Sequence, residues 1–264
     1  MLLLIAAIMA AVGLGFGLWF WWACSEPSST FFRPVLIRGP EEGNRICLTF
    51  DDGPSEQFTE QILAVLREHQ VPATFFVCGR NVEKHPGLLR RIVAEGHEVG
   101  NHTYSHLFVY FKSRRRIAEE IDRTQAIIEQ VVGFRPRVFR PPYGARWFGM
   151  VPTLLERGMH LVQWSATGYD WKKDVKGIVE SALEELKPGA VLLLHDGRET
   201  RPAAEIERQR TVLALPGIIV GARQRGYTFA RLKDFLPSTL TSHIVAQRTT
   251  RKLRGAIWSS RTKD

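Results

Sequence analysis

The chain has 264 residues, of which 44% are hydrophobic and 24% are charged, and it contains three cysteines. This composition excludes wholesale disorder, a collagen-like repeat and a disulfide-stabilised scaffold, and the length allows one large domain or two small ones. The formal net charge is +9 and is unevenly spread: residues 1–24 carry no charged side chain, residues 25–234 carry +4 and residues 235–264 carry +5. More than half of the excess positive charge therefore lies in a C-terminal tail. The motifs of the domain, described below, are not those of a nucleic-acid-binding protein.

The first 24 residues form an uninterrupted apolar run that ends in aromatic side chains at 19–22. About 20 apolar residues cross a bilayer as a helix, and aromatic residues favour the membrane interface, so we predict a transmembrane anchor at 1–24. A cleaved signal peptide is the alternative, but no basic residue precedes the run, and bulky tryptophans stand before Cys24 where cleavage or lipid attachment needs small residues. Arg33 and Arg38 follow the run and weakly favour a cytoplasmic domain.

Residues 25–44 are rich in Ser, Pro, Gly and Glu and predict a linker, and a domain follows at 45–234. Short apolar runs alternate there with segments such as Glu56–His69, whose apolar residues recur at the spacing of one helical face. Several helices are predicted to end at a left-handed glycine, namely Gly96, Gly158 and Gly226. The runs that predict strands are Ile46–Phe50, Ala73–Val77, Glu98–Gly100, Arg137–Phe139, Leu161–Trp164, Ala190–Leu194 and Tyr227–Phe229.

Seven strands alternating with helices predict an α/β fold with a parallel sheet, either open or rolled into a barrel. In both forms the reactive groups lie at the C-terminal ends of the strands. Five of the predicted strands lead into polar, titratable or turn-forming residues. These segments are Asp51-Asp52-Gly53-Pro54, Asn101 to His106, Arg140 to Gly144, Tyr169-Asp170-Trp171 and His195-Asp196.

The adjacent carboxylates Asp51 and Asp52 form either a solvated turn or a working pair. At the end of a buried strand they repel each other unless a cation lies between them, and because they point different ways, one can bind a metal while the other handles a proton. His102 and His106 are four residues apart, which suits two ligands of one zinc-like ion if this loop makes a helical turn. Core or surface histidines are the alternative, and the HExxH protease pattern is excluded because no Glu follows His102.

His195 caps an apolar strand and is either a hydrogen-bonded structural residue or, beside a carboxylate that raises its pKa, a candidate acid. Taken singly, Arg140 is also consistent with a solvated surface arginine, and Tyr143 and Trp171 are also consistent with residues of the core. Their joint placement at strand ends favours a functional site. Cys47 and Cys78 lie on apolar runs and are predicted to pack as small buried side chains.

Together these segments resemble the five ordered motifs of polysaccharide deacetylases with a NodB homology domain, carbohydrate esterase family 4. The resemblance covers residues 44–232 and rests on Thr49–Pro54, His102–His106, Arg140–Tyr143, Tyr169–Trp171 and Leu193–His195. It implies a deformed (β/α)7 barrel and metal-dependent removal of N-acetyl groups from aminosugars. The family's fourth motif often begins with an Asp where this chain has Thr167, although Asp170 and Trp171 are in place.

The resemblance also implies roles for individual residues. The ligands of a divalent metal, usually zinc with cobalt or nickel as alternatives, would be Asp52, His102 and His106. Asp51 would be the base, held by Arg140, and His195 would be the acid, paired with Asp170.

The residues expected to contact substrate are Tyr143, Trp171 and Leu193. Trp171 and Leu193 would enclose the acetyl methyl group, and a backbone N–H near Tyr143 would stabilise the oxyanion. The expected substrate is an N-acetylated glycan such as peptidoglycan, a chitin-like chain or poly-N-acetylglucosamine. A deformylase or deacetylase of a lipid-linked sugar and a non-catalytic glycan-binding module are the alternatives.

The family's substrates imply an extracytoplasmic domain on a single-pass membrane anchor, which is opposite to the orientation that Arg33 and Arg38 favour. The basic tail at 235–264 is either solvated or in contact with anionic lipid headgroups.

Overall fold

The computed structural model describes residues 1–197 and 204–236 of the chain. The helices are α1 (Leu2–Ser25), α2 (Phe58–Glu68), α3 (Gly79–Lys84), α4 (Pro86–Ala94), α5 (Arg114–Val132), α6 (Met150–Glu156), α7 (Val175–Glu185) and α8 (Ala204–Gln224). The strands are β1 (Arg45–Asp51), β2 (Ala73–Val77), β3 (Glu98–Asn101), β4 (Val138–Phe139), β5 (His160–Leu161), β6 (Ala166–Thr167), β7 (Val191–His195) and β8 (Thr228–Phe229). Short 3-10 helices are η1 (Glu42–Asn44), η2 (Pro142–Gly144) and η3 (Leu232–Asp234). The basic tail predicted at 235–264 lies outside the described residues, except for Phe235 and Leu236.

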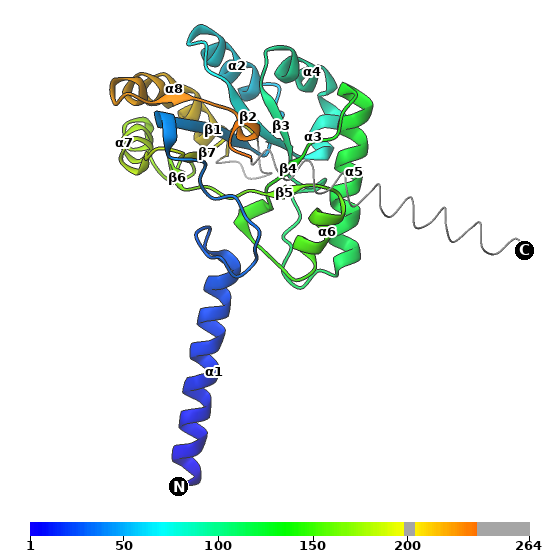
Figure 1. Ribbon diagram of the computed structural model, residues 1–264, viewed down its shortest axis with the longest axis vertical. Coiled ribbons are helices and arrows are strands. Elements are labelled where there is room, and N and C mark those ends of the chain that lie inside the picture. Colours follow the sequence, from blue (N-terminus) through cyan, green and yellow to red (C-terminus); the bar gives the residue numbers. More distant parts are fainter. Residues whose placement is uncertain (198–203, 237–264) are drawn as a thin grey trace, which may run out of the picture.

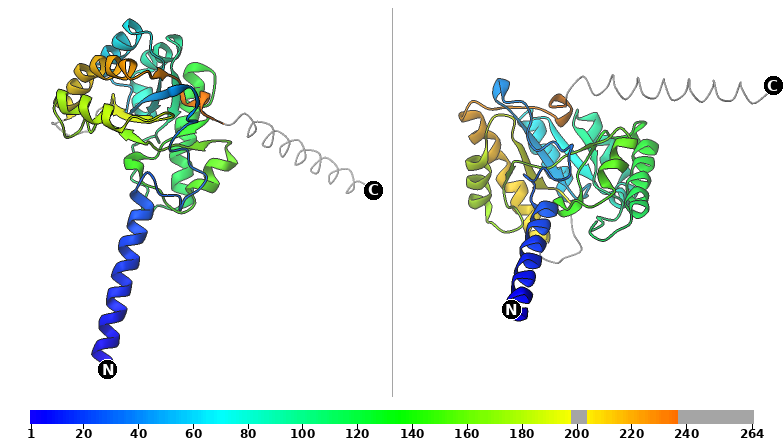
Figure 2. Two further views of the ribbon diagram at one scale, coloured as in Figure 1. Left: turned by 60° about the vertical axis from the view of Figure 1, so that its left-hand side comes forward. Right: turned by 60° about the horizontal axis from the view of Figure 1, so that its bottom comes forward.

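The strands follow one path in the order β5-β4-β3-β2-β1-β7-β6, and β8 pairs with β1 beside that path. Each of these pairings is parallel. The strands β5 and β6 lie at opposite ends of the path although only residues 162–165 separate them in the chain. A connection of this length spans at most about 18 Å, so the sheet must curl until its two ends approach (Figures 1 and 2). The predicted α/β barrel is confirmed as a curled, parallel half-barrel.

One predicted strand is wrong in its bounds. The sequence predicts a strand over Leu161–Trp164, whereas the chain forms β5 up to Leu161 and β6 only after Ser165. The strand β6 is missed because its two residues, Ala166 and Thr167, form no apolar run. Within the predicted linker 25–44, Leu36 bridges to Val162 and Arg38 bridges to Ala190, so this part of the segment lies against the sheet.

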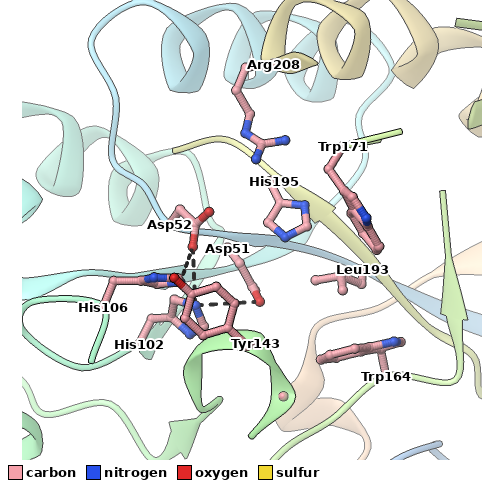
Figure 3. A pocket seen from close by; sticks show the side chains of 11 residues that line it. Asp51, Asp52, His102, His106, Tyr143, Trp164, Trp171, Leu193, His195 and Arg208 are labelled. Carbon is pink, nitrogen blue, oxygen red and sulfur yellow. Dashed lines mark ion pairs between the residues drawn. The ribbon is translucent and has the colours of Figure 1, made fainter. Parts of the chain in front are cut away.

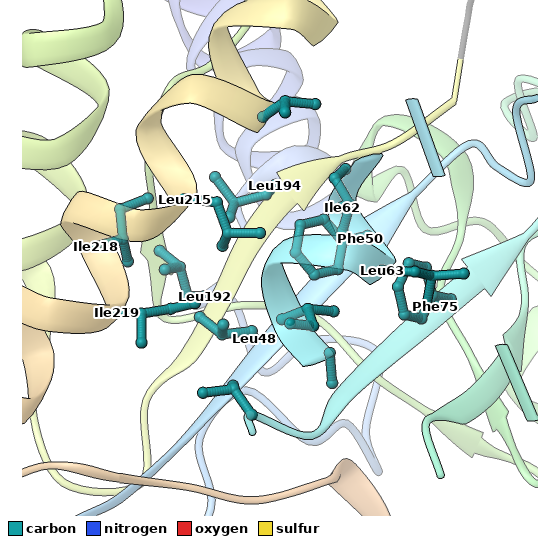
Figure 4. Close-up of a cluster of buried hydrophobic side chains, with 14 of the residues drawn as sticks. Leu48, Phe50, Ile62, Leu63, Phe75, Leu192, Leu194, Leu215, Ile218 and Ile219 are labelled. Carbon is teal, nitrogen blue, oxygen red and sulfur yellow. The ribbon is translucent and has the colours of Figure 1, made fainter. Parts of the chain in front are cut away.

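The alternation of side chains along each strand separates the core from the inner face of the curl. On β1, Leu48 and Phe50 point outward and pack against helices α2 and α8, and Leu192 and Leu194 of β7 do the same (Figure 4). Full burial of each such side chain contributes about 1.5–3 kcal/mol. The intervening residues of β1 and β7 point inward, and that inner face carries the polar groups described below.

Short-range signals set the helix ends. The side chain of Ser113 accepts a hydrogen bond of 3.2 Å from the backbone N–H of Arg116 and so caps the start of α5. The predicted left-handed glycines are confirmed, with φ of 86° at Gly96, 64° at Gly158 and 79° at Gly226. Cys47 and Cys78 are buried and free, as expected of small apolar side chains.

The apolar helix α1 projects away from the α/β domain in all views (Figures 1 and 2). Within the described ranges, it is the one helix that is long and apolar enough to cross a membrane. Its last turn is fixed to the domain by the buried residue Arg146, whose backbone N–H donates to the carbonyl oxygen of Cys24 at 2.9 Å. The guanidinium of Arg146 also donates to the carbonyl oxygens of Ser29, at 2.6 Å, and Glu26. The helix end is therefore packed into the domain rather than loosely tethered to it.

Candidate active site

Asp51 ends β1 on the inner face of the curled sheet, two residues after Thr49. The guanidinium of Arg140, from the loop after β4, binds both: its Nη1 donates to Asp51 Oδ1 at 2.8 Å and to Thr49 Oγ1 at 2.7 Å. Its Nη2 donates to the carbonyl oxygen of Gln163 at 3.1 Å, and the group stacks 4.2 Å from the ring centroid of Phe76. Because both charged groups are buried, losing either would leave an uncompensated charge in the interior. The pair therefore fixes the position of the Asp51 carboxylate.

Asp52 lies just beyond β1 and meets His102 and His106 from the loop after β3. The two Nε2 atoms lie 3.3 and 3.0 Å from Asp52 Oδ1, and one ligand atom from each of the three residues lies within 4.8 Å of the others. The two histidines meet without a helical turn, because this loop is irregular and Thr103 and His106 have positive φ, 64° and 60°. These left-handed residues turn the loop so that both imidazoles reach one carboxylate.

The hydrogen bonds around this cluster fit a divalent metal. His102 Nδ1 lies 2.8 Å from the carbonyl oxygen of Arg140, which only accepts, so Nδ1 carries the proton and the lone pair of Nε2 stays free for a metal. Asp52 Oδ1 is buried and lacks an aligned hydrogen-bond donor within the described part of the chain. One carboxylate and two imidazole lone pairs that converge in this way are a donor set suited to zinc.

His195 ends β7 and pairs with the fully buried Asp170. Its Nδ1 lies 2.8 Å from Asp170 Oδ1, while Oδ2 accepts from the backbone N–H of His195 at 2.9 Å and from the hydroxyl of Thr211 in α8 at 2.8 Å. Burial alone lowers the pKa of His195, but the charge of Asp170 and its hydrogen bond raise that pKa above the ordinary value. For Asp170 the signs are reversed: burial raises its pKa, and the contact with His195 brings it below the ordinary value. The pair thus favours a protonated imidazole.

Asp51 and His195 occupy directly paired positions on neighbouring strands. Adjacent strands lie about 4.8 Å apart, so the sheet itself places a candidate base and a candidate acid side by side. Both line a pocket of about 370 Å³. Figure 3 shows the Asp52 cluster on one side of this pocket and His195 on the other, with Asp51 between them.

The structure brings all ten predicted site residues together. Tyr143, Trp171 and Leu193 line the pocket with the two carboxylates and three histidines (Figure 3). Arg140 contacts Asp51 and Asp170 contacts His195. The ring of Trp171 stands perpendicular to that of His195, with centroids 5.4 Å apart. The centroid of the Tyr143 ring lies 4.7 Å from that of His106.

Two further pocket residues, Arg208 and Trp164, are missed by sequence reasoning. Arg208 in α8 is buried, donates from Nε to the carbonyl oxygen of Gly197 at 2.7 Å, and places Nη1 3.7 Å from Asp170 Oδ2. A single arginine in a helix that carries no motif predicts a solvated face, so no local signal identifies it. Trp164 lies in the run that the sequence assigns to a strand.

Asp196 also has a structural role that the sequence does not reveal. It is buried next to the turn that follows Asp52, where it accepts hydrogen bonds from the hydroxyl of Thr59 at 2.6 Å and from the backbone N–H of Gly53 at 3.2 Å. Burial, reinforced by the charges of Asp52 and Asp51, raises the pKa of Asp196 to about 7. This residue therefore braces the turn that carries the carboxylates.

Thr167 stands where the fourth motif often has an Asp. Its backbone N–H donates to Glu185 at 2.8 Å, and its hydroxyl accepts from the backbone N–H of Tyr169 at 3.2 Å. These contacts fix the start of the loop that carries Asp170, so the departure from the motif leaves the position of that carboxylate supported.

Comparison with known proteins agrees with this geometry. The family model for polysaccharide deacetylase matches residues 38–161. A peptidoglycan-N-acetylglucosamine deacetylase of Bacillus cereus is 37% identical over 202 residues, which cover 76% of this chain and 71% of that protein. A chitooligosaccharide deacetylase of a Bradyrhizobium species is 40% identical over 196 residues, which cover 72% of this chain and 90% of that protein.

Solved structures show the same fold. A crystal structure of a peptidoglycan N-acetylglucosamine deacetylase superposes with a TM-score of 0.72 at 34% identity and covers 76% of this chain and 92% of that one. A family 4 pseudoenzyme from Bacillus anthracis superposes with a TM-score of 0.70 at 25% identity and covers 78% of this chain and 70% of that one. Because the fold also occurs in a pseudoenzyme, the complement of site residues carries the functional argument. The chain belongs to the polysaccharide deacetylases with a NodB homology domain, carbohydrate esterase family 4.

Proposed function

We propose that this protein is a membrane-anchored, metal-dependent hydrolase that removes N-acetyl groups from aminosugars in a glycan such as peptidoglycan, a chitin-like chain or poly-N-acetylglucosamine. One observation carries the proposal: a single pocket holds the Asp52 cluster, a carboxylate fixed by Arg140 and a histidine held protonated by Asp170. Amide hydrolysis needs these three functions, namely an electrophilic centre, a base and an acid.

The residues that would hold the metal are Asp52, His102 and His106. Zinc fits this set best, and cobalt or nickel accepts the same ligands. When bound, the metal supplies Lewis-acid chemistry, which polarises the amide carbonyl and makes water a better nucleophile. The proton of His102 on Nδ1, bound to the carbonyl of Arg140, keeps its Nε2 available as a ligand.

The remaining steps belong to the chain's own acid and base. Asp51, ion-paired with Arg140, takes a proton from the attacking water as the water oxygen adds to the acyl carbon. A backbone N–H near Tyr143 stabilises the oxyanion that forms. His195 then delivers its proton to the amide nitrogen as the C–N bond breaks, which releases acetate and leaves a free amino sugar. Trp171 and Leu193, beside His195 in the pocket, enclose the acetyl methyl group.

The proposed anchor is a retained α1. Its length and apolar composition suit a membrane span, and its last turn supplies the carbonyl of Cys24 as a hydrogen-bond acceptor to the buried Arg146. Cleavage at the end of α1 would remove that acceptor from a buried site, which costs about 1–3 kcal/mol. We place the domain on the extracytoplasmic side, where glycan polymers lie.

Acetate release tests this function. The full chain in detergent, loaded with zinc, should release acetate from N-acetylglucosamine oligosaccharides, and it should bind one metal ion per chain. Asp51→Asn should abolish turnover and keep the bound metal. The control, Asp174→Asn, alters an exposed carboxylate that caps α7 and does not line the pocket, and it should leave turnover unchanged. Full activity of the Asp51→Asn protein would contradict the mechanism.

A further inference from the structure

Two of the loops that supply the site also hold the end of the apolar helix. The loop after β3 carries His102 and His106 and then continues to Tyr110, whose hydroxyl lies 2.6 Å from Ser25 Oγ at the end of α1. The loop after β4 carries Arg140 and then Arg146, which binds three carbonyl oxygens just beyond or within the last turn of α1. Both loops leave the C-terminal ends of the strands, so α1 departs from the same edge of the sheet as the pocket mouth.

Aromatic rings connect the pocket to this helix without a break. Successive ring centroids lie 4.7, 5.6, 4.7, 5.5 and 6.1 Å apart. The rings, in order from the metal cluster to α1, are His106, Tyr143, Phe108, Tyr110, Trp147 and Phe20. Since each step is a direct contact, the pocket rim and the helix end form one continuous surface.

Several of the rings around the helix end are open to solvent. We call Phe31, Phe111, Trp147 and Phe148 the aromatic collar. Its three phenylalanines are 47%, 84% and 55% exposed, respectively, and Phe108 next to it is 48% exposed. Single exposed apolar side chains are ordinary, but a contiguous group of rings marks an interaction surface. Phe20 of α1 contacts Phe31, Trp147 and Phe148, so the collar surrounds the point where the helix leaves the domain.

Basic side chains border the collar. Lys112 and Arg114 to Arg116 follow Phe111 directly, and the arginine side chains are exposed. The acids Glu119, Glu120 and Glu156 pair with these arginines and offset part of their charge. Rings at the depth of the headgroups, with lysine and arginine beside them, are the pattern of a protein surface that lies in a bilayer interface.

We propose that the aromatic collar is seated in the interface of the bilayer that α1 crosses, so that the pocket opens at the membrane surface. The inference rests on the anchored deacetylase proposed above and names its substrate class: N-acetylated glycan that is itself attached to the membrane. A site confined to the surface meets a membrane-attached sugar at a raised effective concentration, which a free sugar does not have.

Spin labels on the full chain test where the collar lies. The native cysteines are buried and free, so a nitroxide reports on Phe111→Cys or Phe148→Cys, with Phe134→Cys as the control. Phe134 is also exposed, but it precedes β4 at the opposite edge of the sheet. In vesicles of phosphatidylcholine with some phosphatidylglycerol, labels at 111 and 148 should be shielded from a water-soluble nickel reagent and accessible to oxygen, and the label at 134 should behave oppositely. Equal nickel access at all three positions would overturn the docking. Label–label broadening that disappears on dilution with unlabelled chain would also overturn it, because a second copy would then cover the collar.

Turnover in the same vesicles tests the substrate class. One chitooligosaccharide is supplied either free or joined to a lipid anchor. The native chain should show kcat/KM about tenfold or more in favour of the lipid-attached form. The double variant Phe111→Ser/Phe148→Ser should lower this ratio with unchanged turnover of the free sugar, although α1 still holds the chain in the membrane, and Phe134→Ser should keep the ratio. A ratio of one in the native chain would refute the substrate class, whereas absence of acetate from both forms would instead refute the proposed function.

Discussion

Replacing Asp170 by Asn should remove the charge that keeps a proton on His195 while preserving the size of the side chain. Asp170 accepts three hydrogen bonds: Oδ1 from His195 Nδ1, and Oδ2 from the backbone N–H of His195 and the hydroxyl of Thr211. An amide retains the two bonds at Oδ2 only by turning its NH2 group toward His195 Nδ1. That nitrogen must then accept, so the ring is neutral and its proton moves to Nε2.

The size of the effect follows from the bond that is lost. A hydrogen bond to a charged group contributes about 1.5–3 kcal/mol, and 1.36 kcal/mol corresponds to one pKa unit, so the pKa of His195 should fall by about 1–2 units. Burial and the positive charge of Arg208 remain, and both lower this pKa further. Because the proposed mechanism uses the protonated form of His195, the basic limb of the pH–rate profile should move to lower pH by the same amount. Above both pKa values, turnover should be about 10–100-fold slower.

The measurement is kcat/KM for acetate release from a soluble N-acetylglucosamine oligosaccharide across the neutral and alkaline range. Thr211→Val is the matched control, because it removes one bond to Asp170 and keeps the charge, so its basic limb should move much less. A uniform loss of rate in Asp170→Asn, with the basic limb unmoved, would refute the assignment of His195 as the proton donor that Asp170 holds.

Three other predictions concern stability and metal binding. Burial lowers the pKa of His97 to about 4. Because the imidazole of the unfolded chain takes up a proton near pH 6.5, folding stability should fall by about 3 kcal/mol as pH drops from about 6.5 to about 4. His97→Gln should therefore flatten the pH dependence of Tm over that range. A Cβ at Gly197 would clash with the backbone of Asp52, whereas a Cβ at Gly87 would contact nothing. In a metal titration, Gly197→Ala should therefore weaken zinc binding about 10–100-fold, and Gly87→Ala, the control, should leave it unchanged. Unchanged affinity in Gly197→Ala would show that Gly197 does not support the Asp52 turn. In chemical denaturation, Leu192→Ala in the core should lower the free energy of unfolding by about 2–5 kcal/mol. Leu213→Ala, at an exposed position of α8, should change it by less than about 0.5 kcal/mol. Equal losses of stability in the two variants would contradict the packing described.

The site residues that the sequence predicts are those fixed by local chain geometry. Asp51 and His195 directly follow apolar runs, and in a parallel sheet the ends of such runs meet at one edge. Arg208 and Thr211 reach the same site from α8, and Thr211 contacts Asp170 across 41 residues of chain. Contacts of this kind depend on how a helix packs against the sheet, and no local pattern encodes them.

The same distinction holds for the fold. Long strands such as β1 and β7 stand out as apolar runs, but β6 has two residues and exists because Ala166 and Thr167 pair with Leu192 and Leu193. The approach of His102 and His106 also depends on backbone conformation, since Thr103 and His106 have positive φ. A β-branched residue such as threonine rarely adopts that conformation, so the local sequence does not predict this geometry.

Asp51 pairs with His195 across β1 and β7. The spacing of the proposed base and acid is therefore set by the hydrogen-bond ladder of two buried strands, and no loop length enters into it. Changes in the loops after β3 and β4 that spare His102, His106 and Arg140 can therefore remodel the rim of the pocket while this spacing stays constant. Slippage of β7 by a single residue has the opposite effect, because it would turn His195 into the core and Leu194 into the pocket.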